Sequence, residues 1–181
     1  MLNLNGETNR RIIESDQQAD SFLSTSIDEL VAVRLCSVRC KEAQIEVAPN
    51  QDYARVIFAE QGSTLSFCVC DGVGGSFKGN FAARYLATRL TDYLMALPGI
   101  PRNPRKVAVE LRKHLEMWAF DAQQELRQAG LPLNVPMLEQ EILAEQRDQH
   151  GSATVFFCGR VNYADPDLPN APPTLPALFC W

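Results

Sequence analysis

A glycine-rich segment placed directly after an apolar run is the feature that most restricts the fold of this chain. The segment reads DGVGGSFKGN over residues 71–80 and contains four of the ten glycines. It follows STLSFCVC (63–70), which predicts a strand, and precedes a stretch with helical periodicity. Because glycine permits close backbone approach and unusual dihedral angles, the sequence predicts a strand, a sharp glycine loop and a helix.

The strand before this loop belongs to a predicted hairpin. YARVIFAE (53–60) and STLSFCVC (63–70) are separated only by Gln61 and Gly62. Antiparallel pairing brings the start of one strand beside the end of the next, so Asp52 and Asp71 are expected at the same end. Two carboxylates repel unless a cation lies between them, and Mg²⁺ and Mn²⁺ favour oxygen ligands. The spacing therefore indicates a metal site; the open alternative is a simple Asp-Gly turn.

Other glycine-rich motifs do not fit the segment. A P-loop needs a hydroxyl residue after its lysine, but Lys78 is followed by Gly79. The dinucleotide-binding pattern fails because Phe77 occupies the third glycine position. A calcium-binding loop needs polar ligands where Val73 and Gly75 stand. These nucleotide and calcium functions are excluded.

The rest of the sequence predicts an α+β fold. Residues 1–26 are polar and aperiodic, which predicts a flexible N-terminal arm, and the prolines at 166–176 predict a surface loop. The remaining predicted elements are strands at 27–38, 152–161 and 177–181, a helix capped by Asn80 with Ala82, Leu86, Leu90 and Leu94 as its apolar stripe, a helix capped by Asn103 and ended by Gly130, and a short helix at 137–147. Strand pairs on both sides of a helix pair favour antiparallel pairing.

Composition narrows the partners and the compartment. The chain has 181 residues and a net charge of −5, so it lacks the basic surplus that nucleic-acid binding requires. It contains neither a run of the roughly 18 apolar residues that a membrane span needs nor an apolar secretory signal. Its six cysteines do not show zinc-ligand spacing, and Cys68 and Cys70 are expected as buried thiols. These features predict a cytoplasmic protein without nucleic-acid or membrane partners.

Three motifs in order resemble a known enzyme family. They are NQD (50–52), FCVCDGVGGSFKGNFAARYLATRL (67–90) and GSATVFF (151–157). Together, over about residues 28–162, they resemble the N-terminal half of the metal-dependent protein phosphatases, the PPM or type-2C Ser/Thr phosphatases, in a bacterial variant. The resemblance implies a partial four-layer α-β-β-α sandwich, with 27–181 as the N-terminal portion of a domain truncated at its C-terminus before the later acidic motifs.

The resemblance also implies a reaction and a set of ligands. Two Mn²⁺ or Mg²⁺ ions activate a water molecule that hydrolyses phosphoserine or phosphothreonine in a phosphoprotein. By position, Asp71 matches the aspartate that bridges both metals, and Gly72 matches the residue that offers a carbonyl oxygen. Asp52 matches the acid of the first motif, and Gln51 stands where some relatives carry a metal-binding glutamate. No catalytic residue beyond these is implied.

The sequence departs from the family pattern in its cationic residues. Relatives carry a phosphate-binding arginine at the position of Val47, and many eukaryotic relatives carry a histidine at that of Val73. The nearby basic residues, none at the right spacing, are Arg34, Arg39 and Lys41. The residue that binds the substrate phosphate is therefore unassigned.

Other residues have expected structural roles, and two alternative functions stay open. His114 is expected on a helix and His150 in a loop, while Gly151 and Ser152 are expected to open a core strand. One alternative is a catalytically inactive, phosphatase-like regulatory or protein-binding module. The other is an unrelated α+β domain, which would require Asp52 and Asp71 to lie far apart.

Overall fold

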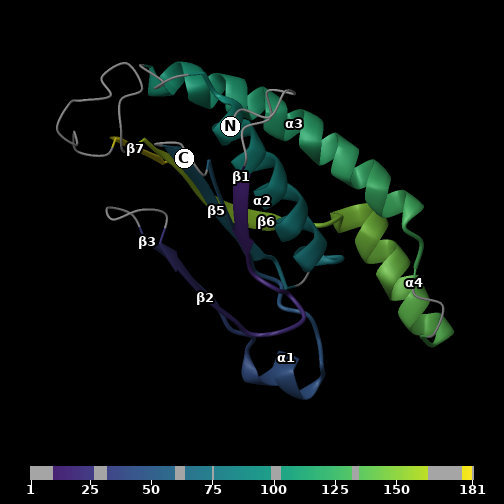
Figure 1. The fold of residues 1–181 in the computed structure, drawn as a ribbon. Coiled ribbons are helices and arrows are strands. Elements are labelled where there is room, and N and C mark those ends of the chain that lie inside the picture. The colour runs from purple at the N-terminus through teal and green to yellow at the C-terminus, as the bar shows by residue number, and fades with distance from the viewer. Residues whose placement is uncertain are drawn as a thin grey trace, which may run out of the picture.

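The computed structural model describes residues 10–26, 32–59, 64–74, 76–98, 103–131, 135–162 and 177–180. These residues form an α+β fold in which helices cover one face of an antiparallel sheet (Figure 1). No helix among them is long and apolar enough to cross a membrane.

Two antiparallel sheets organise the part of the chain that the structure describes. The five-stranded sheet has the order β1-β4-β5-β6-β7, and the two-stranded sheet pairs β2 with β3. The strands are β1 (Arg10–Glu14), β2 (Ser21–Ser26), β3 (Ala32–Ser37), β4 (Tyr53–Ala59), β5 (Thr64–Gly72), β6 (Thr154–Asn162) and β7 (Ala177–Cys180). The helices are α1 (Lys41–Ile45), α2 (Gly79–Ala96), α3 (Pro104–Gln128) and α4 (Met137–Glu145), and a π turn (Gln146–His150) follows α4.

The predicted hairpin is confirmed, whereas the predicted N-terminal arm is wrong over its described part. Strands β4 and β5 pair with Tyr53 opposite Cys70. Residues 10–14 and 21–26 form β1 and β2, and β1 adds an edge to the large sheet beside β4. The apolar pattern missed β1 because only Ile13 of this strand is buried. The prolines of the predicted loop at 166–176 lie outside the described residues.

The helix boundaries confirm two predicted caps and correct a third. The Asn103 side chain accepts a hydrogen bond from the Lys106 N–H at 3.2 Å, and Gly130 takes the left-handed conformation (φ 67°) just after α3. Asn80, in contrast, is inside α2, and the residue before this helix is Lys78 in a left-handed conformation (φ 51°) without a side-chain cap.

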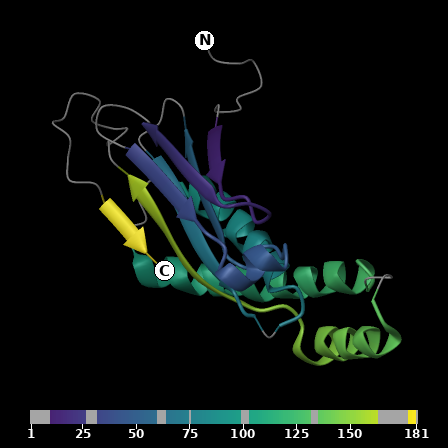
Figure 2. The ribbon, with the colours of Figure 1, turned by 90° about the horizontal axis from the view of Figure 1, so that it is seen from below.

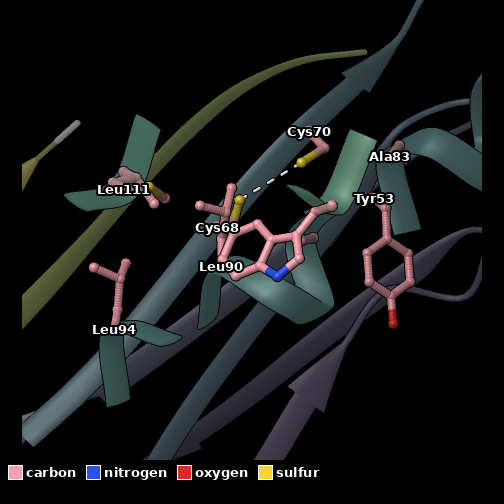
Figure 3. Packing of buried hydrophobic residues seen from close by; sticks show 10 residues of the cluster. Tyr53, Cys68, Cys70, Ala83, Leu90, Leu94 and Leu111 are labelled. Carbon is pink, nitrogen blue, oxygen red and sulfur yellow. Dashed lines mark hydrogen bonds between the residues drawn. The ribbon is translucent and has the colours of Figure 1, made fainter. Parts of the chain in front are cut away.

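Helix α2 packs tightly on one face of the large sheet. Ala83, Ala87, Leu90 and Leu94 are completely buried and contact the buried thiols of Cys68, Cys70 and Cys158. The Cys68 and Cys70 sulfurs lie 3.5 Å apart within this cluster (Figure 3). Small residues at two turns of α2 bring the helix close to the strands, and Leu111 and Trp118 of α3 complete the cluster.

Two buried arginines tie α2 to the sheet. The Arg55 guanidinium of β4 donates to the Thr91 hydroxyl at 2.7 Å and forms an ion pair with Asp92 at 3.2 Å. The Arg160 guanidinium of β6 donates to the carbonyls of Leu94 and Leu97 at the end of α2. Burial lowers the pKa of Arg160. The Arg160 bonds reach carbonyls at the C-terminal end of α2, where a helix has fewer intrahelical donors.

The opposite face of the large sheet is covered only in part. Leu35 of β3 packs into a cluster with residues of the large sheet, namely Ile13, Val56, Phe58 and Leu65. Farther along the strands, the side chains of Val69, Val155 and Phe157 are 50%, 61% and 52% exposed. Figure 2 shows β2 and β3 on one side of the large sheet and α2 and α3 on the other.

Candidate functional site

Asp52 and Asp71 come together at one end of the large sheet. Asp52 immediately precedes β4, and the pairing of Tyr53 with Cys70 sets it beside Asp71 near the end of β5. Partial burial raises the pKa of Asp52, and the Asp71 carboxylate raises it further by repulsion and a side-chain hydrogen bond. This proximity confirms the predicted carboxylate pair.

Both carboxylates project from the sheet face opposite α2. Side chains alternate along a strand, and the residues next to Asp71, Cys70 and Gly72, are buried on the helix side. Tyr53, which follows Asp52, is buried on that same side. Asp52 and Asp71 are exposed, and none of the ion pairs within the described ranges includes either residue. The pair is therefore accessible and without a basic partner there.

Asn50 fixes the position of Asp52. Its side-chain oxygen accepts a hydrogen bond from the Asp52 N–H at 3.1 Å, and its side-chain nitrogen donates to the Ser37 hydroxyl at 2.9 Å. Its own backbone N–H donates to the Gln17 carbonyl at 2.7 Å. The first residue of NQD thus connects the carboxylate end of β4 to β3 and to the β1–β2 connection.

Gln17 is a site residue that the sequence reasoning missed. Its side-chain nitrogen donates to the Asn80 carbonyl at 3.0 Å and lies 3.4 Å from the Asp52 carbonyl. This buried amide joins the connection between β1 and β2 to NQD and to the start of α2. Nothing in the polar run around it distinguishes Gln17 from its neighbours, and the segment was predicted to be a flexible arm.

The glycines are required by close backbone approach. A Cβ on Gly72 would lie 2.6 Å from the carbonyl oxygens of Gln51 and Gly79, and a Cβ on Gly79 would lie 2.8 Å from the Val73 carbonyl. Gly72 itself is still part of β5, so contact between NQD and the glycine segment explains its identity. Gly74 is less constrained, because its Cβ would meet the Gln51 side chain at 3.5 Å. Gly75 lies outside the described residues.

Hydroxyl groups at the start of β6 and just before it bond to the backbone of the glycine-rich segment 71–80. The Ser152 hydroxyl donates to the Lys78 carbonyl at 2.7 Å, and the Thr154 hydroxyl donates to the Asp71 carbonyl at 2.8 Å. Gly151 has a positive φ (62°), which favours glycine, where the π turn enters this segment. The structural role predicted for Gly151 and Ser152 is confirmed, and Thr154 joins them.

Three residues bear on phosphate binding or acid catalysis: Val47, at the position of the expected arginine, Arg39 and His114. Val47 follows α1 in a left-handed conformation (φ 55°), and its side chain is 78% exposed. Arg39 is paired with Asp20 at 3.5 Å. His114 packs between aromatic rings, 4.7 Å from that of Tyr93. None of these observations assigns a residue to a substrate phosphate.

The carboxylate pair offers oxygen donors to a hard cation. Asp52 and Asp71 provide two carboxylates on an exposed rim, which suits a divalent ion that keeps several water ligands. Within the described part of the chain, no group of three or more histidine, cysteine, aspartate or glutamate side chains is placed to hold a metal. The described residues thus supply a two-carboxylate site.

Comparison with protein families, with curated proteins and with solved structures found no match for this chain.

Proposed function

We propose that the chain belongs to a metal-dependent protein Ser/Thr phosphatase of the PPM type. The observation that supports this proposal is the meeting of three motifs at one point. NQD, the glycine segment and GSAT contact one another through backbone and hydroxyl groups around Asp52 and Asp71. The family that these motifs resemble uses the two carboxylates as metal ligands. Their joint position is what that function requires.

The arrangement of layers is consistent with the proposed fold. Helices, the large sheet and the β2–β3 pair form three successive layers, as a partial α-β-β-α sandwich would. In this proposal the phosphoprotein approaches the face that carries Asp52 and Asp71. Val69 and Val155 flank that face and are exposed.

The protein residues perform three tasks in the proposed hydrolysis. Asp52 and Asp71 would bind Mn²⁺ or Mg²⁺, with Gln51 beside them, and Gly72 would contribute its carbonyl oxygen. When bound, such an ion lowers the pKa of a coordinated water and neutralises phosphoryl oxygens. The Thr154 hydroxyl holds the Asp71 backbone in place. Partial burial and then repulsion from Asp71 raise the pKa of Asp52, and a bound cation would offset the repulsion.

Metal binding and activity can be tested separately. Titration with Mn²⁺, followed by the electron paramagnetic resonance signal of the free ion, should show binding that Asp71→Asn weakens at least about tenfold. Mn²⁺-dependent release of phosphate from a phosphothreonine peptide should disappear in the same variant. Asp121→Asn is the matched control, because this exposed aspartate lies on α3 away from the site. Activity that survives Asp71→Asn would refute the assignment.

The second candidate is a phosphatase-like regulatory or protein-binding module without turnover. Two observations favour it: Val47 occupies the position of the phosphate-binding arginine, and the described residues bring only two carboxylates together. This candidate predicts that the folded protein lacks Mn²⁺-dependent phosphatase activity even where it binds the ion. The two measurements above therefore distinguish the candidates.

A further inference from the structure

A groove of about 700 Å³ lies between α2, α3 and the segment that leads into β6. Its walls are mainly apolar and aromatic, and the side chains that define it are Phe81, Tyr85, Leu86, Leu115, Trp118 and Phe156. Phe156 projects from the sheet face that α2 covers, so the groove and the carboxylate pair occupy opposite faces. Its volume is in the range of small-molecule sites, which run from about 300 to 1,000 Å³.

The groove exists because α2 and α3 make their closest contacts at one end. Near the C-terminal half of α2, the Tyr93 ring lies 6.0 Å from the Trp118 ring, and Leu111 packs into the same cluster. Toward the start of α2, Phe81 and the late residues of α3 line an open space instead. The groove is therefore built by α2, α3, the π turn and the start of β6.

One end of the groove carries positive charge. Arg127 of α3 and Arg147 of the π turn line it together with His150, whereas no aspartate or glutamate among the residues that the structure describes lines it. Asp148, outside the lining, pairs with Arg147 at 2.9 Å and also lies in the field of Arg127. Among the described residues, one carboxylate therefore stands against two guanidinium groups at this end, although the chain as a whole carries a net charge of −5.

We propose that this groove binds an apolar carboxylate of fatty-acid size. The hydrocarbon part would lie against the aromatic walls, where burial of apolar surface provides affinity. The carboxylate would lie at the end formed by Arg127 and Arg147, because arginine pairs with carboxylates in a two-point geometry. Charge complementarity thus selects an anionic ligand over a neutral one. This inference does not depend on phosphatase activity.

Trp118 provides the signal for a binding test. The chain has two tryptophans, so Trp181→Phe leaves Trp118 as the only one, and it lines the groove. Decanoate should change its fluorescence in a saturable way, and 1-decanol, which has the same chain but no charge, should bind about tenfold more weakly. Equal binding of decanoate and 1-decanol, or no saturable change with decanoate, would overturn the proposal.

Two kinds of variant test separately the shape of the groove and the charge of its arginine end. Ala122→Phe, or Ala119→Phe at an exposed lining position, should fill the groove and abolish decanoate binding. The double variant Arg127→Gln, Arg147→Gln should reduce decanoate affinity to that of 1-decanol and leave 1-decanol unchanged. Arg112→Gln is the matched control, because this exposed arginine of α3 does not line the groove. Circular-dichroism melts identify any variant that fails to fold.

The same variants detect a different occupant. If a second copy of the chain filled the groove, sedimentation would show a dimer that Ala119→Phe dissociates, and decanoate would bind more tightly as the protein is diluted. That result would replace the small-molecule proposal by self-association. A monomer whose decanoate affinity is independent of protein concentration, and is lost in Ala119→Phe, supports it.

Discussion

The two faces of the large sheet differ in what their side chains do. The face under α2 is closed: Leu90 and Leu94 are fully buried, and Arg55 and Arg160 bond to the helix. The other face is half open and carries Asp52 and Asp71 beside exposed apolar residues. Strand alternation puts residues of the two faces next to each other along one strand, as with buried Cys70 and exposed Asp71 of β5. The same strands therefore provide stability on one face and a candidate site on the other.

The largest predicted effect removes a side chain from the closed face. Leu90→Ala should lower the free energy of unfolding by about 3 kcal/mol, because α2 cannot move closer to fill the cavity. The measurement is urea denaturation followed by circular dichroism. Val155→Ala on the open face is the comparison, with an expected change below about 0.5 kcal/mol. Equal costs on the two faces would show that the open face is covered in solution.

The next prediction concerns the contact between NQD and the glycine-rich segment 71–80 at Gly72. Gly72→Ala should cost about 2 kcal/mol, because its Cβ would collide with the backbone carbonyls of Gln51 and Gly79. The displacement should also weaken Mn²⁺ binding, measured by the same resonance titration. Gly74→Ala is the control and should be tolerated, since its Cβ meets only a side chain at 3.5 Å. A tolerated Gly72→Ala would contradict the close packing of NQD on the glycine segment.

A somewhat smaller loss is expected from the buried arginine at the end of α2. Arg160→Met keeps an apolar stem but removes the donors to the carbonyls of Leu94 and Leu97, at a cost of about 1.5 kcal/mol in unfolding free energy. Thermal melts provide the measurement. Arg89→Met on the exposed side of α2 should change stability much less. Indistinguishable melts for the two variants would mean that Arg160 does not support the helix.

The smallest effect is a gain of stability on the open face. The pKa of Asp52 is raised in the folded state. Just above pH 3.8 the Asp52 carboxyl therefore stays protonated in the folded protein but ionises in the unfolded chain. The cost of ionising Asp52 therefore appears as the pH rises from 3.8 through the folded-state value, and it persists above. Without metal, Asp52→Asn should be more stable than the parent at pH 7 by at most about 0.5 kcal/mol after solvent screening.

Two further comparisons check the origin of that gain. The stability difference between Asp52→Asn and the parent should vanish near pH 3, where both side chains are neutral. Added Mn²⁺ should raise the melting temperature of the parent but not of the variant. A variant that gains nothing at pH 7, or that Mn²⁺ still stabilises equally, would argue against repulsion between Asp52 and Asp71.

Several site features could be predicted from the sequence because they depend on neighbours along the chain. The hairpin placed Asp52 beside Asp71, since pairing of consecutive strands is local. The cap at Asn103 and the end of α3 before Gly130 follow from side-chain and backbone chemistry within one turn. The position of α2 was also predicted, although its buried stripe contains Ala83 and Ala87, where Ala82 and Leu86 were expected.

The strands β1 and β2 and the role of Gln17 depend on long-range contacts and could not be predicted from the sequence. The strands at 10–14 and 21–26 have little apolar periodicity of their own and are ordered by pairing with β4 and β3. Gln17 acquires its role only because NQD and the start of α2 come within hydrogen-bond distance of its amide. A polar side chain reveals nothing in sequence about a partner more than thirty residues away.

By itself the sequence determined the α+β class, the strand-loop-helix around DGVGGS and the meeting of two carboxylates. Periodicity and turn chemistry act over a few residues, so they are legible in the order of the amino acids. The tertiary structure alone decided which face of the sheet is closed, where Arg55 and Arg160 find partners, and that α2, α3 and β6 enclose a groove. Those outcomes depend on how separate elements pack, because burial and hydrogen-bond satisfaction are properties of the assembled chain.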